Sequence, residues 1–144
     1  MLTTTAFVSD VARYILDRMG TMSTMKLHKL VYYAQAWSLV WDECPLFSEI
    51  IEAGDHGPMV PALYQQHAGP FLVAPSDVPG DPSQLDTNAK DTLDAVLAFY
   101  GPHTAQWLGD LARQEDPWRQ MRDGPIKGEI TLAALHEYYS GLSG

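Results

Sequence analysis

The amino-acid sequence predicts a mainly α protein, a single compact helical domain with a small β element of two or three strands. Apolar residues recur at three- and four-residue spacing in most segments, which are bounded by capping residues, glycine or proline. One short run, residues 48–53, is instead rich in β-branched residues. The 144 residues, 46% of them hydrophobic, suffice for a sizeable core, so residues 1–144 are expected to form one domain.

The first two helices are predicted from their periodicity and their ends. Apolar residues at helical spacing cover residues 5–19, and Gly20 provides a stop. Ser23 or Thr24 can cap the next helix, whose apolar stripe continues to Trp41. We therefore expect two successive helices joined by a short connection.

Proline and glycine interrupt the pattern after the second helix. Residues 48–53 predict a turn and a short strand that ends at Gly54. A short helix is expected to begin at Pro58 or Pro61, because proline suits the first turn of a helix. Residues 70–86 are rich in Pro, Gly, Ser and Asp, and they are predicted to form a surface loop that joins two helical halves.

Further helices are predicted in the C-terminal half. Thr87 and Thr104 can each cap one, and the final helix begins near Thr131. Residues 128–130 lead into that final helix. They could pair with residues 50–51 as a two-stranded patch.

The charge balance limits the classes of partner. Nine Lys and Arg residues stand against 18 Asp and Glu residues, which gives a formal net charge of −9. A duplex-binding face needs clustered basic residues, and here they are scattered, so a basic partner is favoured over nucleic acid. A single cysteine, Cys44, with no leader and no long apolar run, predicts a soluble cytoplasmic protein without a membrane partner.

No residue pattern indicates an enzyme, a metal site or a cofactor. The histidines lack zinc-site spacing, and no glycine-rich nucleotide loop occurs. Ser23 and Lys26 match an S-x-x-K motif, but the companion motifs of such hydrolases are missing, so a helix cap is preferred. Cys44 is interpreted as a small buried hydrophobe. Glu115 and Asp116 are expected to solvate or cap the helical turn that follows them.

The second predicted helix carries more aromatic residues than one buried stripe can hold. Tyr32, Tyr33 and Ala36 cannot all share that stripe with the aliphatic residues around them. Some aromatic side chains are therefore expected at the surface, where Tyr and Trp contribute strongly to binding energy. This pattern suggests a protein-binding face on an acidic body.

Several ordered segments carry a family resemblance. They are MKLHKLVYYAQAW at 25–37, PLF at 45–47, IEA at 51–53, GPMVPALY at 57–64, a block at 108–122 centred on QEDPW, and the closing helix at 130–139. Together they resemble the Panacea antitoxin domain, a SocA-like, phage-associated family, over about residues 7–139. Two departures are visible: Asp55-His56 replaces the usual aromatic or basic pair before Gly-Pro, and Ala112-Arg113 replaces the usual Thr-His before QEDPW.

The resemblance implies the antitoxin of a toxin-antitoxin system, a protein that neutralises a cognate toxin by direct binding and without catalysis. It also implies a mainly helical fold with a small β element. One branch of the family is similar to a proteolytic adaptor that hands its toxin to an ATP-dependent protease, and the sequence does not decide between these roles. Two further classes of protein stay open. One is a phage-related DNA-binding regulator, which the acidic balance disfavours, and the second is a small hydrolase using Ser23 or Cys44.

Two sets of residues follow from this interpretation. The first is predicted mainly to hold the domain together: Lys29, Tyr33, Gly57, Pro58, Asp116, Pro117 and Trp118. The second is predicted to contact the toxin: Tyr32, Trp37, Asp55, His56, Tyr64, Asp77 and Asp81. The expected partner is a toxin with a basic active-site surface, which an acidic antitoxin would meet with complementary potential. The departures at 55–56 and 112–113 are expected to tune partner choice.

Overall fold

A computed structural model describes residues 6–67, 71–123 and 128–143. Within these ranges the helices are α1 (Val8–Met19), α2 (Thr24–Trp41), α3 (Pro61–His67), α4 (Thr87–Tyr100), α5 (Ala105–Gln114), α6 (Asp116–Asp123) and α7 (Leu132–Ser143). The strands are β1 (Met22–Ser23), β2 (Ile51–Gly54), β3 (Gly57–Met59), β4 (Leu72–Val73) and β5 (Glu129–Ile130). The predicted fold class, mainly α with a small β element, is confirmed.

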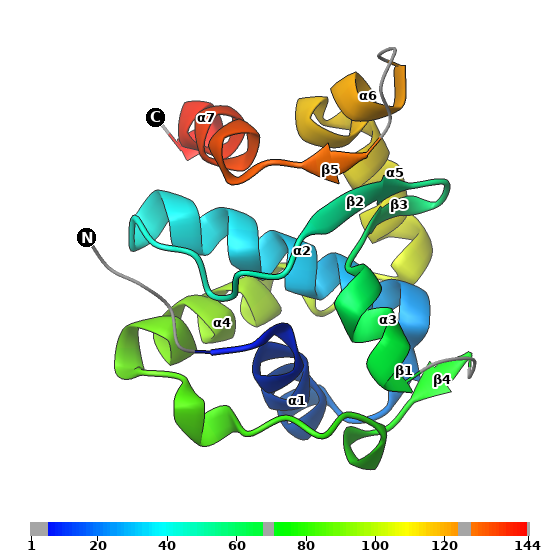
Figure 1. The fold of residues 1–144 in the computed structure, drawn as a ribbon, viewed down its shortest axis with the longest axis vertical. Helices are drawn as coiled ribbons and strands as arrows, with labels where there is room; N and C mark the ends of the chain where they lie inside the picture. The colour runs from blue at the N-terminus through cyan, green and yellow to red at the C-terminus, as the bar shows by residue number, and fades with distance from the viewer. Residues whose placement is uncertain (1–5, 68–70, 124–127, 144) are drawn as a thin grey trace.

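Helix α2 forms the centre of the molecule, with α1 and α4 on one side and α6 and α7 on the other (Figure 1). Every residue from 27 to 36 is buried, because other elements cover α2 on all sides. The expectation that this helix has room for only one buried stripe is therefore wrong. Tyr32 and Tyr33 are both fully buried, because neighbouring elements cover the helix around its whole circumference.

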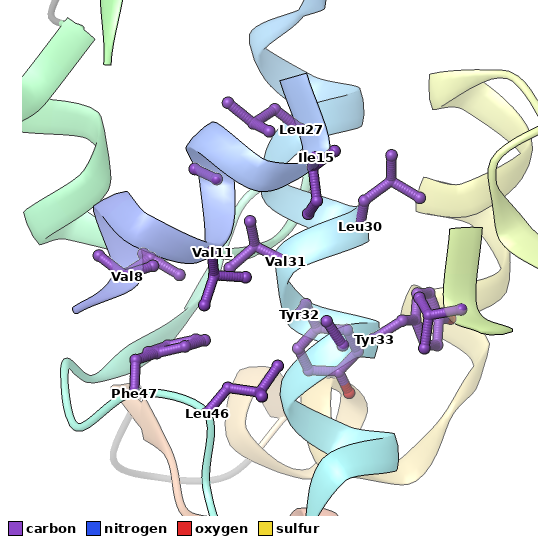
Figure 2. Close-up of a cluster of buried hydrophobic side chains, with 14 of the residues drawn as sticks. Val8, Val11, Ile15, Leu27, Leu30, Val31, Tyr32, Tyr33, Leu46 and Phe47 are labelled. Carbon is purple, nitrogen blue, oxygen red and sulfur yellow. The ribbon is translucent and has the colours of Figure 1, made fainter. Parts of the chain in front are cut away.

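Figure 2 shows the part of the hydrophobic core that lies between α1, α2 and the segment that follows α2. Val11 and Ile15 of α1 pack in the same cluster as Val31 of α2 and Phe47. The buried Gln35 fixes that segment, since its amide nitrogen donates to the Phe47 carbonyl at 2.8 Å and its amide oxygen accepts from the Leu46 N–H at 2.7 Å. Both ends of this buried amide are thereby hydrogen-bonded.

The three-stranded sheet has the order β3-β2-β5 and is antiparallel throughout. Ile51 pairs with Ile130, which confirms the predicted pairing between these two segments. Strands β2 and β3 form a hairpin, and Gly57 follows its turn with φ +127°, a value that favours glycine. Of the two predicted starts of the short helix, Pro61 is the observed one, because Pro58 lies in β3.

The helix starts show how local sequence fixes the elements. The Ser23 side chain accepts from the Lys26 N–H at 3.2 Å, so the cap interpretation of the S-x-x-K match is confirmed. Thr104 caps α5 in the same manner. Asp86 rather than Thr87 caps α4, because its carboxylate accepts from the Ala89 N–H at 2.8 Å.

Residues 71–86 connect the two halves and include β4 and two short 3-10 turns, Pro75–Asp77 and Pro82–Gln84. Strand β4 pairs with β1, a pairing that the sequence did not predict. The segment packs closely on α1, where a Cβ at Gly80 would lie 2.0 Å from the Ser9 carbonyl oxygen. Val78 is buried, while Asp77 and Asp81 are exposed as a surface loop requires. Among the described helices, none is long and apolar enough to span a membrane.

Candidate functional site

A pocket of about 350 Å³ opens between the N-terminal half of α2, the β2–β3 hairpin and α3. Its lining consists of residues 54–59, Tyr64 of α3, and Thr24, Met25, His28 and Lys29 of α2. Met25, Pro58 and Met59 make much of the wall apolar. A concave, mostly apolar surface with a few polar groups is the usual form of a binding site.

Side chains of α5 and α6 hold the hairpin that forms one wall of this pocket. The Trp118 indole N–H donates to the Gly54 carbonyl at 2.8 Å, and the Arg113 guanidinium donates to the His56 carbonyl at 2.8 Å. Arg122 forms an ion pair with Asp55 at 2.9 Å. The hairpin turn is thus fixed from the QEDPW side of the molecule.

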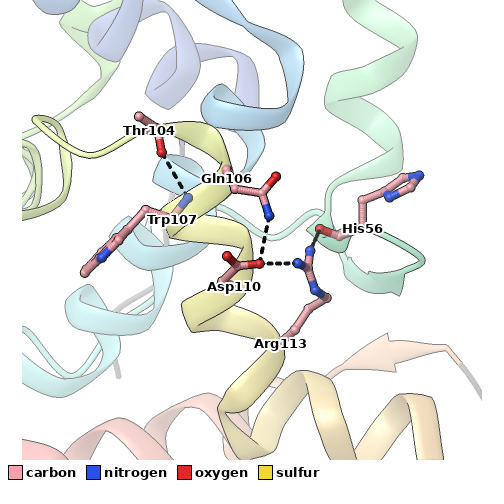
Figure 3. A network of polar contacts seen from close by, with 6 residues as sticks. All are labelled: His56, Thr104, Gln106, Trp107, Asp110 and Arg113. Carbon is pink, nitrogen blue, oxygen red and sulfur yellow. Dashed lines mark hydrogen bonds and ion pairs between the residues drawn. The ribbon is translucent and has the colours of Figure 1, made fainter.

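Arg113 is itself held in place by a polar network on α5 (Figure 3). Its guanidinium contacts the Asp110 carboxylate at 2.6 Å, and Gln106 donates to the same carboxylate at 3.0 Å. The two departures from the family's usual residues, at 55–56 and at 112–113, are therefore in contact. Arg113 of the second departure donates to the main-chain carbonyl of His56 in the first.

Lys29 extends from α2 between two glycines, Gly57 of β3 and Gly109 of α5. A Cβ at either glycine would lie 3.0 Å from the lysine Cε atom. Lys29 is 2% exposed, and its ammonium makes one long hydrogen bond, 3.4 Å to the Met25 carbonyl. Burial, followed by the positive charge of Arg113, lowers the pKa of Lys29 to about 8.

His28 forms a buried pair with His67 of α3. Its Nδ1 atom accepts the Val60 N–H at 3.1 Å, so the proton of the neutral ring is on Nε2. That proton is donated to Nε2 of His67, also at 3.1 Å. The remaining His67 proton is then on Nδ1, which is buried and has no hydrogen-bond partner among the described residues. Burial lowers the pKa of both rings, that of His28 to about 3.

Glu115 is buried, and this corrects the prediction that it solvates or caps a helical turn. Its Oε1 atom accepts the hydroxyl protons of Tyr33 and Tyr139, each at 2.7 Å. Tyr32 in turn bonds the Tyr139 hydroxyl at 2.9 Å. Burial raises the pKa of Glu115, and the two tyrosine hydrogen bonds oppose that rise. The network joins α2, the α5–α6 junction and α7.

The structure places the predicted partner-binding residues in four different situations, of which three leave them at least partly exposed. Asp55, His56 and Tyr64 are exposed and lie together at the pocket. Trp37 is half-buried, and its indole N–H donates to the Tyr100 hydroxyl at 2.9 Å. Asp77 and Asp81 are exposed on the segment that packs against α1, and they do not line the pocket.

Tyr32, which was also predicted to bind the partner, does not lie at the surface. It is 0% exposed, so the prediction that it is available to a partner is wrong. The physical reason is the cover that α7 provides, since Tyr139 of α7 packs against and hydrogen-bonds Tyr32. Trp41, one helical turn after Trp37 and stacked on it, is 50% exposed instead.

The residues predicted to hold the domain together lie at contacts between segments. Lys29 and Gly57 touch each other, Tyr33 bonds Glu115, and Trp118 bonds the hairpin. Pro58 and Pro117 are buried, and Asp116 pairs with Arg119 on the surface of α6. The contributions of these residues to stability remain predictions.

Sequence reasoning gave Glu115 the wrong surroundings and gave no site role to Tyr139 or Gly109, and it expected Arg113 to tune partner choice but not to hold the hairpin. No helical periodicity distinguishes these residues. The signal that could have found Glu115 is its place inside the QEDPW run, next to residues already predicted to be structural. The candidate nucleophiles show no activation: Ser23 is a helix cap, and partial burial raises the pKa of Cys44, which is half-buried rather than buried as expected.

Residues 27–119 match the family described as antitoxin SocA-like, Panacea domain. The match covers more than half of the chain, and the chain belongs to this family. No curated protein and no solved structure matches the chain. The matched span contains the hairpin, Lys29, Arg113 and Trp118, so the pocket is built almost entirely from the family's own segment.

Proposed function

We propose that this protein is a non-catalytic antitoxin that neutralises a cognate protein toxin by binding it directly. Membership of the antitoxin SocA-like family supports an antitoxin-type role. The observation that supports the binding mechanism is the fixed conformation of the β2–β3 hairpin. Side chains of α5 and α6, namely Arg113, Trp118 and Arg122, bond to it. Its preformed surface would lose little conformational freedom on association, and this favours affinity.

Charge supports the nature of the partner. A formal net charge of −9 complements a toxin with a basic active-site surface and would speed their encounter. We also propose that the protein acts in the cytoplasm, as one member of a prophage-encoded toxin-antitoxin pair. Absence of catalysis is also part of the proposal, because neither candidate nucleophile among the described residues is activated.

The proposed toxin-binding face is centred on Asp55, His56 and Tyr64. These side chains are exposed around one concavity, and they combine a carboxylate, an imidazole and an aromatic ring. Tyrosine is enriched among residues that dominate binding energy. Trp37 with its neighbour Trp41, and the loop carrying Asp77 and Asp81, are proposed as peripheral contacts.

The test is co-expression with the product of the adjacent reading frame, followed by measurement of growth and of complex recovery. Asp55→Lys and Tyr64→Ala are expected to weaken the complex at least about tenfold, as central contacts do. Asp91→Lys and Phe99→Ala are the matched controls, because both residues are exposed on α4 and lie outside the pocket. Equal effects of the controls would contradict the hairpin face.

Two further measurements distinguish the antitoxin from a proteolytic adaptor and from a DNA-binding regulator. Rescue of growth that disappears in a host lacking an ATP-dependent protease would identify a proteolytic adaptor. A salt-dependent mobility shift of promoter DNA would identify a DNA-binding regulator. If the adjacent product is harmless and no complex forms, the antitoxin proposal fails.

A further inference from the structure

The pocket contains a buried positive charge that the described residues leave nearly unpartnered. A lysine ammonium has three N–H donors, and Lys29 uses one of them in a long contact of 3.4 Å with a carbonyl. No carboxylate of the described residues lies within ion-pair distance of it. Lysine is rarely this deeply buried without a paired acid.

The neighbouring ionisable groups do not supply the missing partner. Arg113 of α5 is paired with Asp110, and Asp55 of the hairpin is paired with Arg122. His28 of α2 is uncharged in its pair with His67. His56 is exposed at the pocket and could add only positive charge. An anion entering from outside would therefore meet a cation with free donors.

The fold makes room for this lysine at two positions. A methyl side chain at Gly57 or at Gly109 would crowd the Lys29 Cε atom, and the two glycines avoid this. A methionine at position 29 would fill the same channel without the cost of burying a charge. A buried polar group that opposes stability in this way points to a binding role.

We propose that this pocket binds a carboxylate carried on a small apolar or aromatic group, with the Lys29 ammonium donating to a carboxylate oxygen. The walls formed by Met25, Pro58, Met59 and Tyr64 would contact the apolar part. The volume of about 350 Å³ suits one small ligand or one side chain. The pocket adjoins the proposed toxin-binding face, but the test of this site is independent of the antitoxin role, because it uses the isolated chain.

The experiment is a titration of the full chain, labelled with ¹³C at its methionine methyl groups, with benzoate and with its uncharged analogue benzamide. Benzoate is expected to shift the Met25 and Met59 signals saturably, with a dissociation constant on the order of 1 mM for so small a ligand. Benzamide is expected to bind at least about tenfold more weakly, because its neutral carbonyl can accept a hydrogen bond from the ammonium but cannot form an ion pair with it. Equal binding of both probes, or no shift with benzoate, would overturn the proposal.

Lys29→Met keeps the length of the side chain and removes the charge, so it should fold and lose benzoate binding. Lys90→Met on α4, outside the pocket, is the matched control and should bind benzoate as the wild type does. Retained binding in Lys29→Met would refute the assignment. If that variant does not fold, the wild-type pH profile decides: affinity should fall about tenfold per unit above pH 8 as Lys29 loses its proton. A flat profile up to pH 10 would refute it as well.

A final arm identifies the source of the carboxylate. Benzoate is added to the complex with the adjacent gene product. Release of the partner means that an acidic side chain of the partner occupies the pocket. An intact complex that still binds benzoate means that the pocket serves a free small carboxylate. Either result is compatible with the site, while the absence of any complex would count against the antitoxin proposal alone.

Discussion

The Glu115 network predicts a definite order of stability losses when its tyrosine hydroxyls are removed. Tyr139 donates its proton to Glu115, so the hydrogen bond between Tyr32 and Tyr139 must be donated by Tyr32. Tyr139→Phe therefore removes two hydrogen bonds, one to a carboxylate and one from a buried hydroxyl. Tyr33→Phe removes one bond to the carboxylate, and Tyr32→Phe removes only the outer neutral bond.

The magnitudes follow from the type of bond lost. A hydrogen bond to a charged group contributes about 1.5–3 kcal/mol and a neutral one about 0.5–1.5 kcal/mol. We expect losses of about 3 kcal/mol for Tyr139→Phe, about 2 kcal/mol for Tyr33→Phe and about 1 kcal/mol for Tyr32→Phe. Urea unfolding followed by circular dichroism measures them. Tyr138→Phe is the control, because Tyr138 lies beside Tyr139 and makes no hydrogen bond to Glu115. A Tyr32→Phe loss equal to that of Tyr139→Phe would refute this donor assignment.

Two further predictions concern His28 and Gly57. Burial lowers the pKa of His28 to about 3, so below pH 6.5 this histidine binds a proton in the unfolded protein but not in the folded one. The free energy of unfolding should therefore fall by up to about 1.4 kcal/mol per pH unit as the pH decreases from 6.5 towards 3. His28→Gln should reduce the dependence of stability on pH, whereas the control His103→Gln, on the half-exposed loop after α4, should not. Unfolding midpoints measured across this pH range test the prediction. A pH dependence that is unchanged in His28→Gln would contradict it. Gly57→Ala should cost about 1–3 kcal/mol through its φ of +127° and its approach to Lys29. Gly141→Ala, in open space on α7, should instead gain up to about 1 kcal/mol, so thermal unfolding of the two variants should shift in opposite directions.

Periodicity and capping chemistry predicted the elements whose cause is local. Ser23 and Thr104 cap helices because a hydroxyl near the first free N–H groups is a local arrangement. The pairing of Ile51 with Ile130 was also within reach, since both lie in short β-branched runs next to turns. The pairing of β1 with β4 was not, because two-residue strands carry no periodic signal.

The environment of α2 could not be predicted because it depends on how many elements cover the helix. A stripe argument assumes that one face of a helix meets solvent, yet α1, α4, α5 and α7 all pack against α2. Tyr32 therefore lies inside, bonded to Tyr139 from a segment 107 positions away in the sequence. The burial of Glu115 was missed for the same reason, since its partners come from α2 and α7.

The buried polar residues of this domain fall into two kinds, and the difference assigns their roles. Gln35 joins α2 to the segment that follows it, Glu115 joins α2 and α7 to the α5–α6 junction, and the hydrogen bonds of both residues are short. Such groups specify the packing, because leaving any one of them unpaired would cost free energy. Lys29 packs between Gly57 and Gly109 but forms no hydrogen bond or ion pair to another described segment, since its long bond goes back to its own helix. A charged group that is as buried as Glu115 but makes no polar link to another described segment is best explained by something that enters the pocket beside it.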